Sequence, residues 1–369
     1  MITPGDDYPI HQTSRPVRDT GTERNFYDRF FFNGYPTTGH GYFAAAFGVY
    51  PGRNVMDAAF SVISDGVQYN VRASRLLGAD RLDTQVGPVR ITILEPLRRL
   101  RIQVDDPESG LAADLTFAAR SPAYEEMPYL WRPGNRTLFD YTRLTQHGSW
   151  FGSITVPGGK VLTVEPASWW GTRDRSWGVR PVGEREQGAP DGPGPAGFYW
   201  LWAPLQFDDA GYLWDVNETP DGQTWHCEAM ASPVSDGPDA LDLPVEHAQP
   251  TYRFDFKPGT RHAAAFELRL QLPNGPRTLT LEPLYNFFML GVGYGHPTQG
   301  HGMFLGESFR DADSWVVADV DETNPFHQHI QALCRVRRDD GAEGIGILEQ
   351  LIFGPHRPSG FTDLLDMHA

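Results

Sequence analysis

The segment AFELRLQLPNG, residues 265–275, indicates the fold class of this chain. Between Phe266 and Leu272, apolar residues occupy every second position, and charged or polar residues fill the positions between them. That period of two is typical of a β-strand with one buried face. The segment closes with Asn-Gly, the dipeptide that most strongly favours a tight β-hairpin. A partner strand is therefore expected through residues 279–281.

The same alternation recurs in the first half of the chain, at residues 89–93 and 100–104. Residues 345–353 form a later and more continuous apolar run, as in a fully buried strand. Helical periodicity is scarce, and 31 prolines and 39 glycines interrupt the chain every few residues. We therefore predict an all-β protein built from short antiparallel strands.

The length of 369 residues favours two domains over a single core. Residues 183–197, GEREQGAPDGPGPAG, have the composition of a linker and lie near mid-chain. We predict an N-terminal domain at 1–182 and a C-terminal domain at 183–369. Three short sequences recur in both halves: Gly-Tyr at 41–42 and 211–212, Leu-Glu-Pro-Leu at 94–97 and 281–284, and Thr-Gln-His-Gly at 145–148, resembled by 298–302. These echoes favour a duplicated β domain, each copy a barrel or sandwich.

Charge and composition limit the classes of partner. The formal net charge of −16 disfavours binding to nucleic acid or to anionic membrane surfaces. The sequence lacks an N-terminal signal peptide, a long apolar run and a disulfide framework, so we expect a soluble cytoplasmic protein. Aromatic residues make up 12% of the chain, which fits either a pocket for an apolar ligand or a tryptophan-rich core.

The densest group of chemically active residues is WWGTRDRSWGVRP, at 169–181. On a strand, Asp174 shares one face with Trp170, while Arg173, Arg175 and Trp177 share the other. If the Asp174 face borders a pocket, desolvation raises the pKa of the carboxyl group and makes it a general acid. If it borders the packing side, Asp174 instead belongs to a structural ion-pair cluster with the arginines. Both readings remain open.

A second group lies at residues 294–307, where histidines and a glutamate follow closely spaced glycines. His301 or Glu307 can move a proton, although a surface pair of histidines beside a turn has the same appearance. His40 is a weaker candidate of this kind in the first half.

A third group is His327-Gln328-His329. On a strand, both imidazoles of such a pair lie on one face, which is a metal-ligand spacing, and Glu349 or His356 can complete the site. Spacing alone places no further ligand, so we expect no metal.

The segment GTRDRSWGVRP at 171–181, with QHGSWFG at 146–152 and GHGMFLGE at 300–307, resembles the hydroxyneurosporene synthase family. This carotenoid 1,2-hydratase group is also called the AttH-like, lipocalin-like two-domain family. The resemblance implies two lipocalin-like β domains packed together, with a ligand pocket in or between them. It also implies an enzyme that needs neither metal nor organic cofactor, since relatives include hydratases of isoprenoid double bonds and pericyclases.

We therefore predict a cofactor-independent lyase (hydratase or dehydratase) or isomerase that acts on a C=C bond of an apolar, terpenoid-like molecule. The predicted catalytic residues are Asp174, His301, Glu307 and His40. The predicted substrate-binding residues are Trp177, Trp170, Trp202, Tyr294, Tyr199 and Phe304. Two alternatives stay open: a carrier that binds a lipophile without reacting with it, and a metal-dependent cupin-like enzyme. The oligomeric state is not predicted.

Overall fold

The computed structural model describes residues 3–10, 19, 21–132, 134–184 and 197–369. Within these residues the regular elements are β-strands and short 3₁₀-helices, with no α-helix, so the predicted all-β class is confirmed. None of the helices in this part of the chain is long and apolar enough to cross a membrane.

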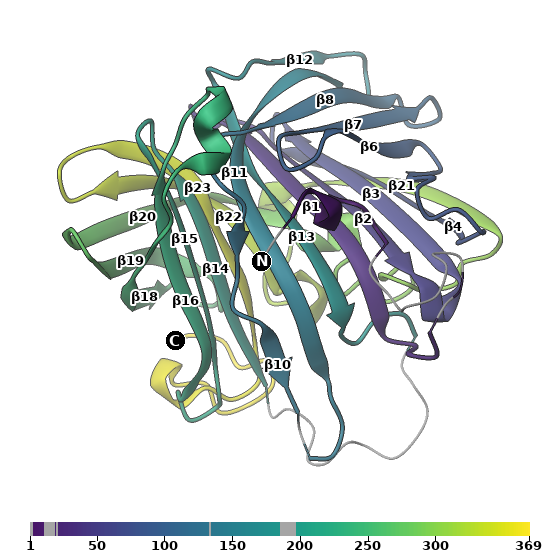
Figure 1. The fold of residues 1–369 in the computed structure, drawn as a ribbon. Helices are drawn as coiled ribbons and strands as arrows, with labels where there is room; N and C mark the ends of the chain where they lie inside the picture. The colour runs from purple at the N-terminus through teal and green to yellow at the C-terminus, as the bar shows by residue number, and fades with distance from the viewer. Residues whose placement is uncertain (1–2, 11–18, 20, 133, 185–196) are drawn as a thin grey trace.

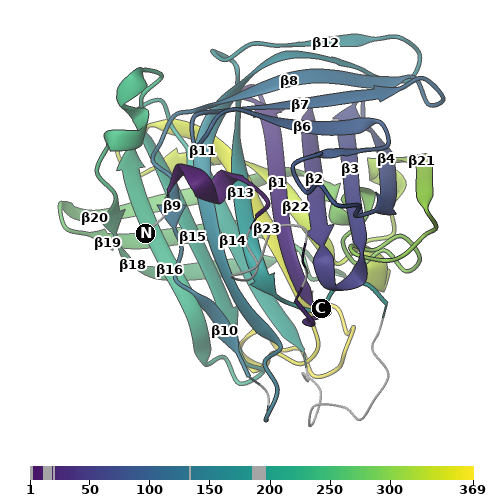
Figure 2. The same cartoon turned by 45° about the vertical axis from the view of Figure 1, so that its right-hand side comes forward.

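The strands form two antiparallel sheets, which lie side by side as curled layers in Figures 1 and 2. The first sheet has the order β21-β4-β3-β2-β1-β13-β11-β8-β7-β6-β5, with β9, β10 and β12 paired to β11. The second has the order β17-β16-β15-β14-β23-β22-β20-β19-β18. These curled sheets match the predicted lipocalin-like architecture.

The strands of the first sheet are β1 (Phe26–Pro36), β2 (Tyr42–Tyr50), β3 (Val55–Ser64), β4 (Val67–Leu76), β5 (Gln85–Val86), β6 (Val89–Glu95), β7 (Arg99–Asp106), β8 (Leu111–Ala119), β9 (Tyr124–Glu125), β10 (Tyr129–Trp131), β11 (Phe139–Thr155), β12 (Val161–Val164), β13 (Trp169–Val179) and β21 (Ser308–Val316). Those of the second sheet are β14 (Phe198–Gln206), β15 (Ala210–Glu218), β16 (Thr224–Pro233), β17 (Glu246–His247), β18 (Gln249–Phe256), β19 (Ala263–Leu272), β20 (Gly275–Phe288), β22 (His329–Arg338) and β23 (Glu343–Phe353). The 3₁₀-helices are η1 (Pro4–Asp7), η2 (Pro51–Arg53), η3 (Pro238–Asp242), η4 (Met289–Val292), η5 (Val317–Asp319), η6 (Pro325–His327) and η7 (Arg357–Ser359).

The hairpin predicted from residues 265–275 is confirmed as β19–β20, with Leu272 opposite Gly275. The turn itself falls on Pro273 and Asn274, one position earlier than the Asn-Gly dipeptide indicated. Gly275 opens β20 at a φ of +114°, a conformation that a side chain would strain. The strands predicted at residues 89–93 and 100–104 are the paired β6 and β7.

The two faces of each sheet belong to different cores. On β1, Phe30 and Phe32 pack inside the first sheet, and Phe31 between them points the other way. On β14, Leu201 packs inside the second sheet, and Trp202 points out of it. The outward residues of both sheets meet in a third core, which joins the two layers. The alternation of side chains along the strands therefore builds two sheet interiors and one interface between them.

Between β13 and β14 the chain passes from one sheet to the other, but the division is not complete. β21 comes after β20 of the second sheet and pairs with β4 of the first. Most of the predicted linker, residues 185–196, lies outside the described residues. The domain boundary at 182/183 thus stays a prediction.

Two of the three repeated short sequences do not occupy equivalent positions in the two halves, so the prediction that they mark such positions is wrong. Residues 94–97 span the end of β6 and the first two residues of the turn after it, whereas 281–284 lie within β20. Residues 145–148 lie on β11, whereas 298–302 lie in the connection before β21. Only the Gly-Tyr pairs occupy corresponding places, at the beginnings of β2 and β15, the second strand of each half. The physical reason is that a repeated sequence of only a few residues does not determine its strand or its position along that strand.

Candidate functional site

A cavity of about 720 Å³ lies between the two sheets. Alternate residues of four long strands line it: Phe139, Tyr141 and Arg143 on β11, Asp174 and Ser176 on β13, Phe198, Trp200 and Trp202 on β14, and Glu349, Leu351 and Phe353 on β23. The period of two explains this set, because every second side chain of a strand faces the same side. The lining is therefore mainly aromatic, with a few polar groups at defined places.

Asp174 projects into this cavity from β13, between Phe31 of β1 and Thr145 of β11 in the sheet. It forms no hydrogen bond or ion pair with any described residue. Burial raises the pKa of its carboxyl group from the usual value to about 7, against the opposing charges of Arg143 and Arg29. A carboxylic acid in this state is partly protonated at neutral pH.

The other face of β13 is structural. Arg173 is fully buried, and its Nη1 donates to Oδ1 of Asp7 at 2.5 Å. Arg175, also fully buried, pairs with Asp28. Trp177 shares this face and lies outside the cavity, with its ring 5.9 Å from the Arg175 guanidinium. Arg173 and Arg175 thus pair with other carboxylates, and neither forms an ion pair with Asp174.

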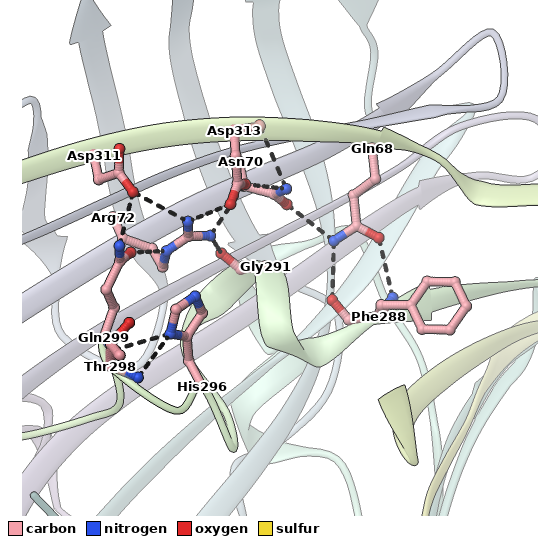
Figure 3. Close-up of polar contacts among 10 residues, drawn as sticks. All are labelled: Gln68, Asn70, Arg72, Phe288, Gly291, His296, Thr298, Gln299, Asp311 and Asp313. Atoms are coloured by element: carbon pink, nitrogen blue, oxygen red, sulfur yellow. Dashed lines mark hydrogen bonds and ion pairs between the residues drawn. The ribbon is translucent and has the colours of Figure 1, made fainter. Parts of the chain in front are cut away.

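Residues 293–303 supply another wall of the cavity and are held against the first sheet by polar side chains of β4 (Figure 3). Gln68 exchanges two hydrogen bonds with the backbone of Phe288, at 2.9 and 3.0 Å. Arg72 donates to Gln299 Oε1 at 2.6 Å and to the Gly291 carbonyl at 3.2 Å. These contacts fix both ends of the turn that carries Tyr294 into the cavity.

Two further carboxylates complete this anchor in Figure 3. Asp313 of β21 pairs with Arg72 at 2.6 Å and accepts from Asn70 at 2.8 Å. Asp311 accepts from Gln299 at 2.7 Å. The pairing of β21 with β4 therefore also positions the cavity wall that precedes β21 in the chain.

His301 reaches the cavity, but its ring is already engaged. Nε2 lies 2.9 Å from Nη2 of Arg29, so it must accept that hydrogen bond, and Nδ1 lies 3.6 Å from Asp57. Burial and the Arg29 charge lower the pKa of the imidazole to about 4. His301 is therefore neutral at pH 7, with the lone pair on Nε2 occupied.

A histidine–glutamate pair lines the cavity from the second sheet. Nε2 of His329, on β22, lies 2.8 Å from Oε1 of Glu349 on β23. Trp200 and Gln331 also donate to this carboxylate, at 3.2 and 2.5 Å. Burial disfavours the charged form of Glu349, but the hydrogen bonds outweigh it and hold the pKa below the usual value. In the neutral tautomer that donates Nε2–H to Glu349, Nδ1 of His329 is an acceptor.

Arg143 on β11 is an arginine of the cavity that has two carboxylate partners. It contacts Glu126 at 2.6 Å and Asp215 at 2.7 Å. Its guanidinium lies 4.9 Å from the Trp200 ring and 5.8 Å from the Trp202 ring. Two carboxylates offset its charge, so it acts as a fixed support for the tryptophans.

Of the residues predicted for the site, the structure brings four together in this cavity: Asp174, His301, Trp202 and Tyr294. Glu307 and Phe304 are exposed outside it. His40 borders a different cavity, of about 1150 Å³. These three placements are corrections, because the turns after residue 303 and before Tyr42 direct their side chains elsewhere.

Two further aromatic residues predicted to bind substrate are core residues. Trp170 is buried between the sheets, with the Arg120 guanidinium 4.4 Å from its ring. Tyr199 is buried in the second sheet and stacks on His356 at 4.1 Å. Tyr199 follows Phe198 on β14, and the alternation of the strand turns it away from the cavity.

The histidine pair considered as a metal site is not on one strand face. His327 ends η6, and its Nδ1 contacts the Asp321 backbone, whereas His329 begins β22. His356 pairs with Glu218 at 3.1 Å. Within the described residues, no group of three His, Cys, Asp or Glu side chains is placed to hold a metal ion.

Sequence reasoning does not predict that His329 and Glu349 form a hydrogen-bonded pair in the cavity, or that Arg143 and Arg180 line it. The sequence pattern indicates His329 and Glu349 only as metal-ligand candidates. The alternation of Trp200 and Trp202 with Leu201 was a usable signal for a cavity wall. Arg180 lies two residues beyond Gly178 on the extension of β13, and its position on the Asp174 face also follows from that period.

Comparison with known proteins places the chain within a family and a fold. A model described as "Family of unknown function (DUF8625)" matches residues 2–362. No curated protein matches the chain.

Among solved structures, a protein assigned as AttH, from Nitrosomonas europaea, is 15% identical, with a TM-score of 0.50, covering 93% of this chain and 98% of that chain. CghA, crystallised with Sch210972, is 13% identical, with a TM-score of 0.52, covering 95% and 96%. Kievitone hydratase from Nectria haematococca is 14% identical, with a TM-score of 0.41, covering 88% of each chain. The first two similarities confirm the AttH-like resemblance at the level of the fold.

Proposed function

This chain belongs to the family of unknown function DUF8625, and we propose that it is a cofactor-independent enzyme of the hydratase type. Its substrate would be an apolar, unsaturated small molecule bound in the cavity between the sheets. The reaction would be acid-initiated addition of water to a C=C bond, its reversal, or migration of that bond.

The observation that carries this proposal is the state of Asp174. It is a carboxyl group without a partner among the described residues, with a pKa of about 7, in a cavity whose other lining is mainly aromatic. A general acid is most effective when its pKa lies near the working pH. An apolar binding site has no structural need for such a group, since desolvating an unpaired acid is unfavourable.

The proposed steps use groups from both sheets. The Asp174 proton is transferred to one alkene carbon, the π electrons form the new C–H bond, and the other carbon becomes cationic. The faces of Trp200 and Trp202 stabilise that cation without adding to it. A water oxygen then forms the C–O bond and passes its proton to Nδ1 of His329, whose imidazolium is stabilised by Glu349. Return of that proton through water to Asp174 closes the cycle.

The fold supports a small-molecule ligand. CghA, with which this chain shares its fold, was crystallised with the small molecule Sch210972. Cavities of 300–1,000 Å³ lined by aromatic side chains and a few polar groups are typical binding sites for such molecules.

The rival function is a carrier that binds a lipophile without reacting with it. A carrier needs only the apolar lining, and a lumen without ionisable groups would favour it. Asp174 and the His329–Glu349 pair favour the enzyme, because they supply an acid and a base on two different sheets around one cavity.

Isotope incorporation separates the two functions. Ligands that co-purify with the protein are identified by mass spectrometry and incubated with it in D₂O, alongside geraniol, farnesol and lycopene. We expect carbon-bound deuterium in at least one compound, and its loss with Asp174→Asn. Saturable binding without deuterium incorporation in any bound compound would instead establish the carrier.

A further inference from the structure

Arg180 is a cation of the cavity that has no carboxylate partner among the described residues. It follows β13 directly, and its backbone N–H donates to the Asn25 carbonyl at 3.2 Å, which holds it at the edge of the sheet. Its guanidinium lines the same cavity as Asp174 and forms no ion pair or side-chain hydrogen bond with any described residue. Arg143, the other arginine lining the cavity, is paired with both Glu126 and Asp215.

Tyrosine rings surround the Arg180 guanidinium. The ring centroid of Tyr27 lies at 4.5 Å and that of Tyr294 at 6.0 Å. Aromatic faces offset part of the cost of placing a cation here, but they accept none of its N–H hydrogens. The guanidinium therefore presents unsatisfied donors to the cavity.

A second arginine increases the positive potential at this end. Arg29 lies under Tyr294, 4.4 Å from the ring centroid, and its only described side-chain hydrogen bond goes to the neutral His301. Its Nε and Nη1 atoms have no hydrogen-bond partner in the part of the chain that the structure describes. Asp57 is the nearby carboxylate, and it already accepts from the Tyr50 hydroxyl and the Gly302 N–H. This end of the cavity is thus locally cationic within a chain of net charge −16.

Arg180 and Asp174 lie on the same face of one extended segment. They are six residues apart, which corresponds to about 20 Å between Cα atoms at the rise of a β-strand. The register of β13 with β1 is continuous from Asp174 to Val179, so no bulge shortens this path. The charges of both side chains act on the Tyr294 hydroxyl, so the two groups belong to one region of the cavity. A ligand held at both residues therefore needs a polar end beside Arg180 and an apolar body that reaches Asp174.

We propose that Arg180 binds a planar oxyanion of the carboxylate type at one end of the substrate. This inference rests on the proposed function, because it places the reacting C=C bond at Asp174, in the apolar body of the ligand and away from its polar end. A guanidinium suits such a group, since its N–H donors match the two oxygens of a carboxylate. The substrate class is then an unsaturated apolar acid, and a neutral hydrocarbon would leave Arg180 unpaired.

The test compares cis-parinaric acid, a fluorescent polyene acid, with its methyl ester. The two probes have the same chain and differ in the head-group charge. We expect the wild-type protein at pH 8 to bind the acid at least tenfold more tightly than the ester. The preference should fall to about one in Arg180→Gln and Arg180→Met and be partly kept in Arg180→Lys. Arg253→Gln, the same charge change at an exposed position on β18, should leave the preference unchanged.

The results of this binding test can be distinguished from those of the deuterium test of the proposed function. Equal affinity of the wild-type protein for acid and ester overturns the inference without any variant, and so does a preference that survives Arg180→Gln. Failure of both probes to bind overturns it as well. An Arg180-dependent preference without deuterium incorporation in any bound compound supports the head-group site and refutes the hydratase chemistry.

Discussion

Asp174 and Arg175 are consecutive residues of β13, and their side chains lie on opposite faces of the sheet. Arg175 is fully buried and paired with Asp28, whereas Asp174 borders the cavity and has no partner among the described residues. One strand therefore supplies a structural ion pair on one side and an available acid on the other. Arg175 thus has a structural role, and a chemical role for Asp174 stays a prediction.

Removing the acid should abolish activity without loss of fold. Asp174→Asn keeps the shape of the side chain, and we expect kcat to fall by at least ~100-fold, the typical contribution of general acid catalysis. In the wild-type protein, kcat/KM should decline above pH 7, because the protonated form of a group with a pKa of about 7 is then lost. Steady-state kinetics from pH 5 to 9 checks both. Full activity in Asp174→Asn would refute the assignment.

The same carboxyl group should make stability depend on pH. Its pKa is raised in the folded state to about 7, from about 4 in an unfolded chain. The folded state therefore binds the extra proton, so the stability from this group is complete below pH 4 and is lost as pH rises to 7. Between these limits the wild-type protein should lose about 1.4 kcal/mol per pH unit relative to Asp174→Asn. Urea unfolding at several pH values measures this. A parallel pH dependence of the two proteins would contradict the raised pKa.

Removing the buried ion pair between Arg173 and Asp7 should destabilise the protein. Arg173→Met leaves Asp7 buried without its cation, and we expect a loss of about 3–5 kcal/mol in the free energy of unfolding. Arg101→Met removes an exposed ion pair with Asp114 and is the matched control, with a much smaller effect. Chemical unfolding of both variants gives the comparison. Equal losses would show that the burial of Asp7 is energetically unimportant.

The activity of the proposed base, His329, should depend on its carboxylate partner, Glu349. His329→Gln removes the proposed proton acceptor, and Glu349→Gln removes the charge that stabilises its imidazolium. Each should lower kcat by roughly 100-fold, and the double variant should lose little more than either one, because the two act as a unit. Fully additive losses in the double variant would argue that the residues act independently.

Ligand binding should depend on the aromatic wall of the cavity. Phe198→Ala removes a lining side chain, whereas Phe304→Ala removes an exposed one. We expect the wild-type protein to quench its tryptophan fluorescence saturably with an apolar ligand of ten or more carbons, at micromolar Kd or better, about −8 kcal/mol. The affinity should weaken in Phe198→Ala and stay constant in Phe304→Ala. Identical titrations of the two variants would place the ligand elsewhere.

The strands themselves could be predicted from local pattern. The alternation at residues 266–272 defined β19 and its buried face, because a period of two is a property of the extended backbone alone. The same rule put Asp174 and Arg175 on opposite faces of β13. It could not tell which of those faces borders a cavity, because that depends on where the second sheet packs.

The site is a product of contacts between distant segments. His329 and Glu349 are twenty residues apart and meet because β22 and β23 pair in a register that puts Gln331 opposite Glu349. Tyr294 reaches Arg29 and Arg180 because β21 crosses to β4 and carries the preceding turn onto the first sheet. Neither arrangement leaves a local trace in the sequence.

The sequence by itself determined the all-β class, the hairpin of β19 and β20, and the opposed faces of β13, since each follows from the spacing of neighbouring residues along an extended chain. Only the tertiary structure decided that the sheets pack by their outer faces, that the cavity lies between them, and that Asp174 meets no partner there among the described residues. The physical reason is that a raised pKa and an unsatisfied guanidinium depend on burial and on the position of charges far apart in the chain, which are properties of the packed molecule.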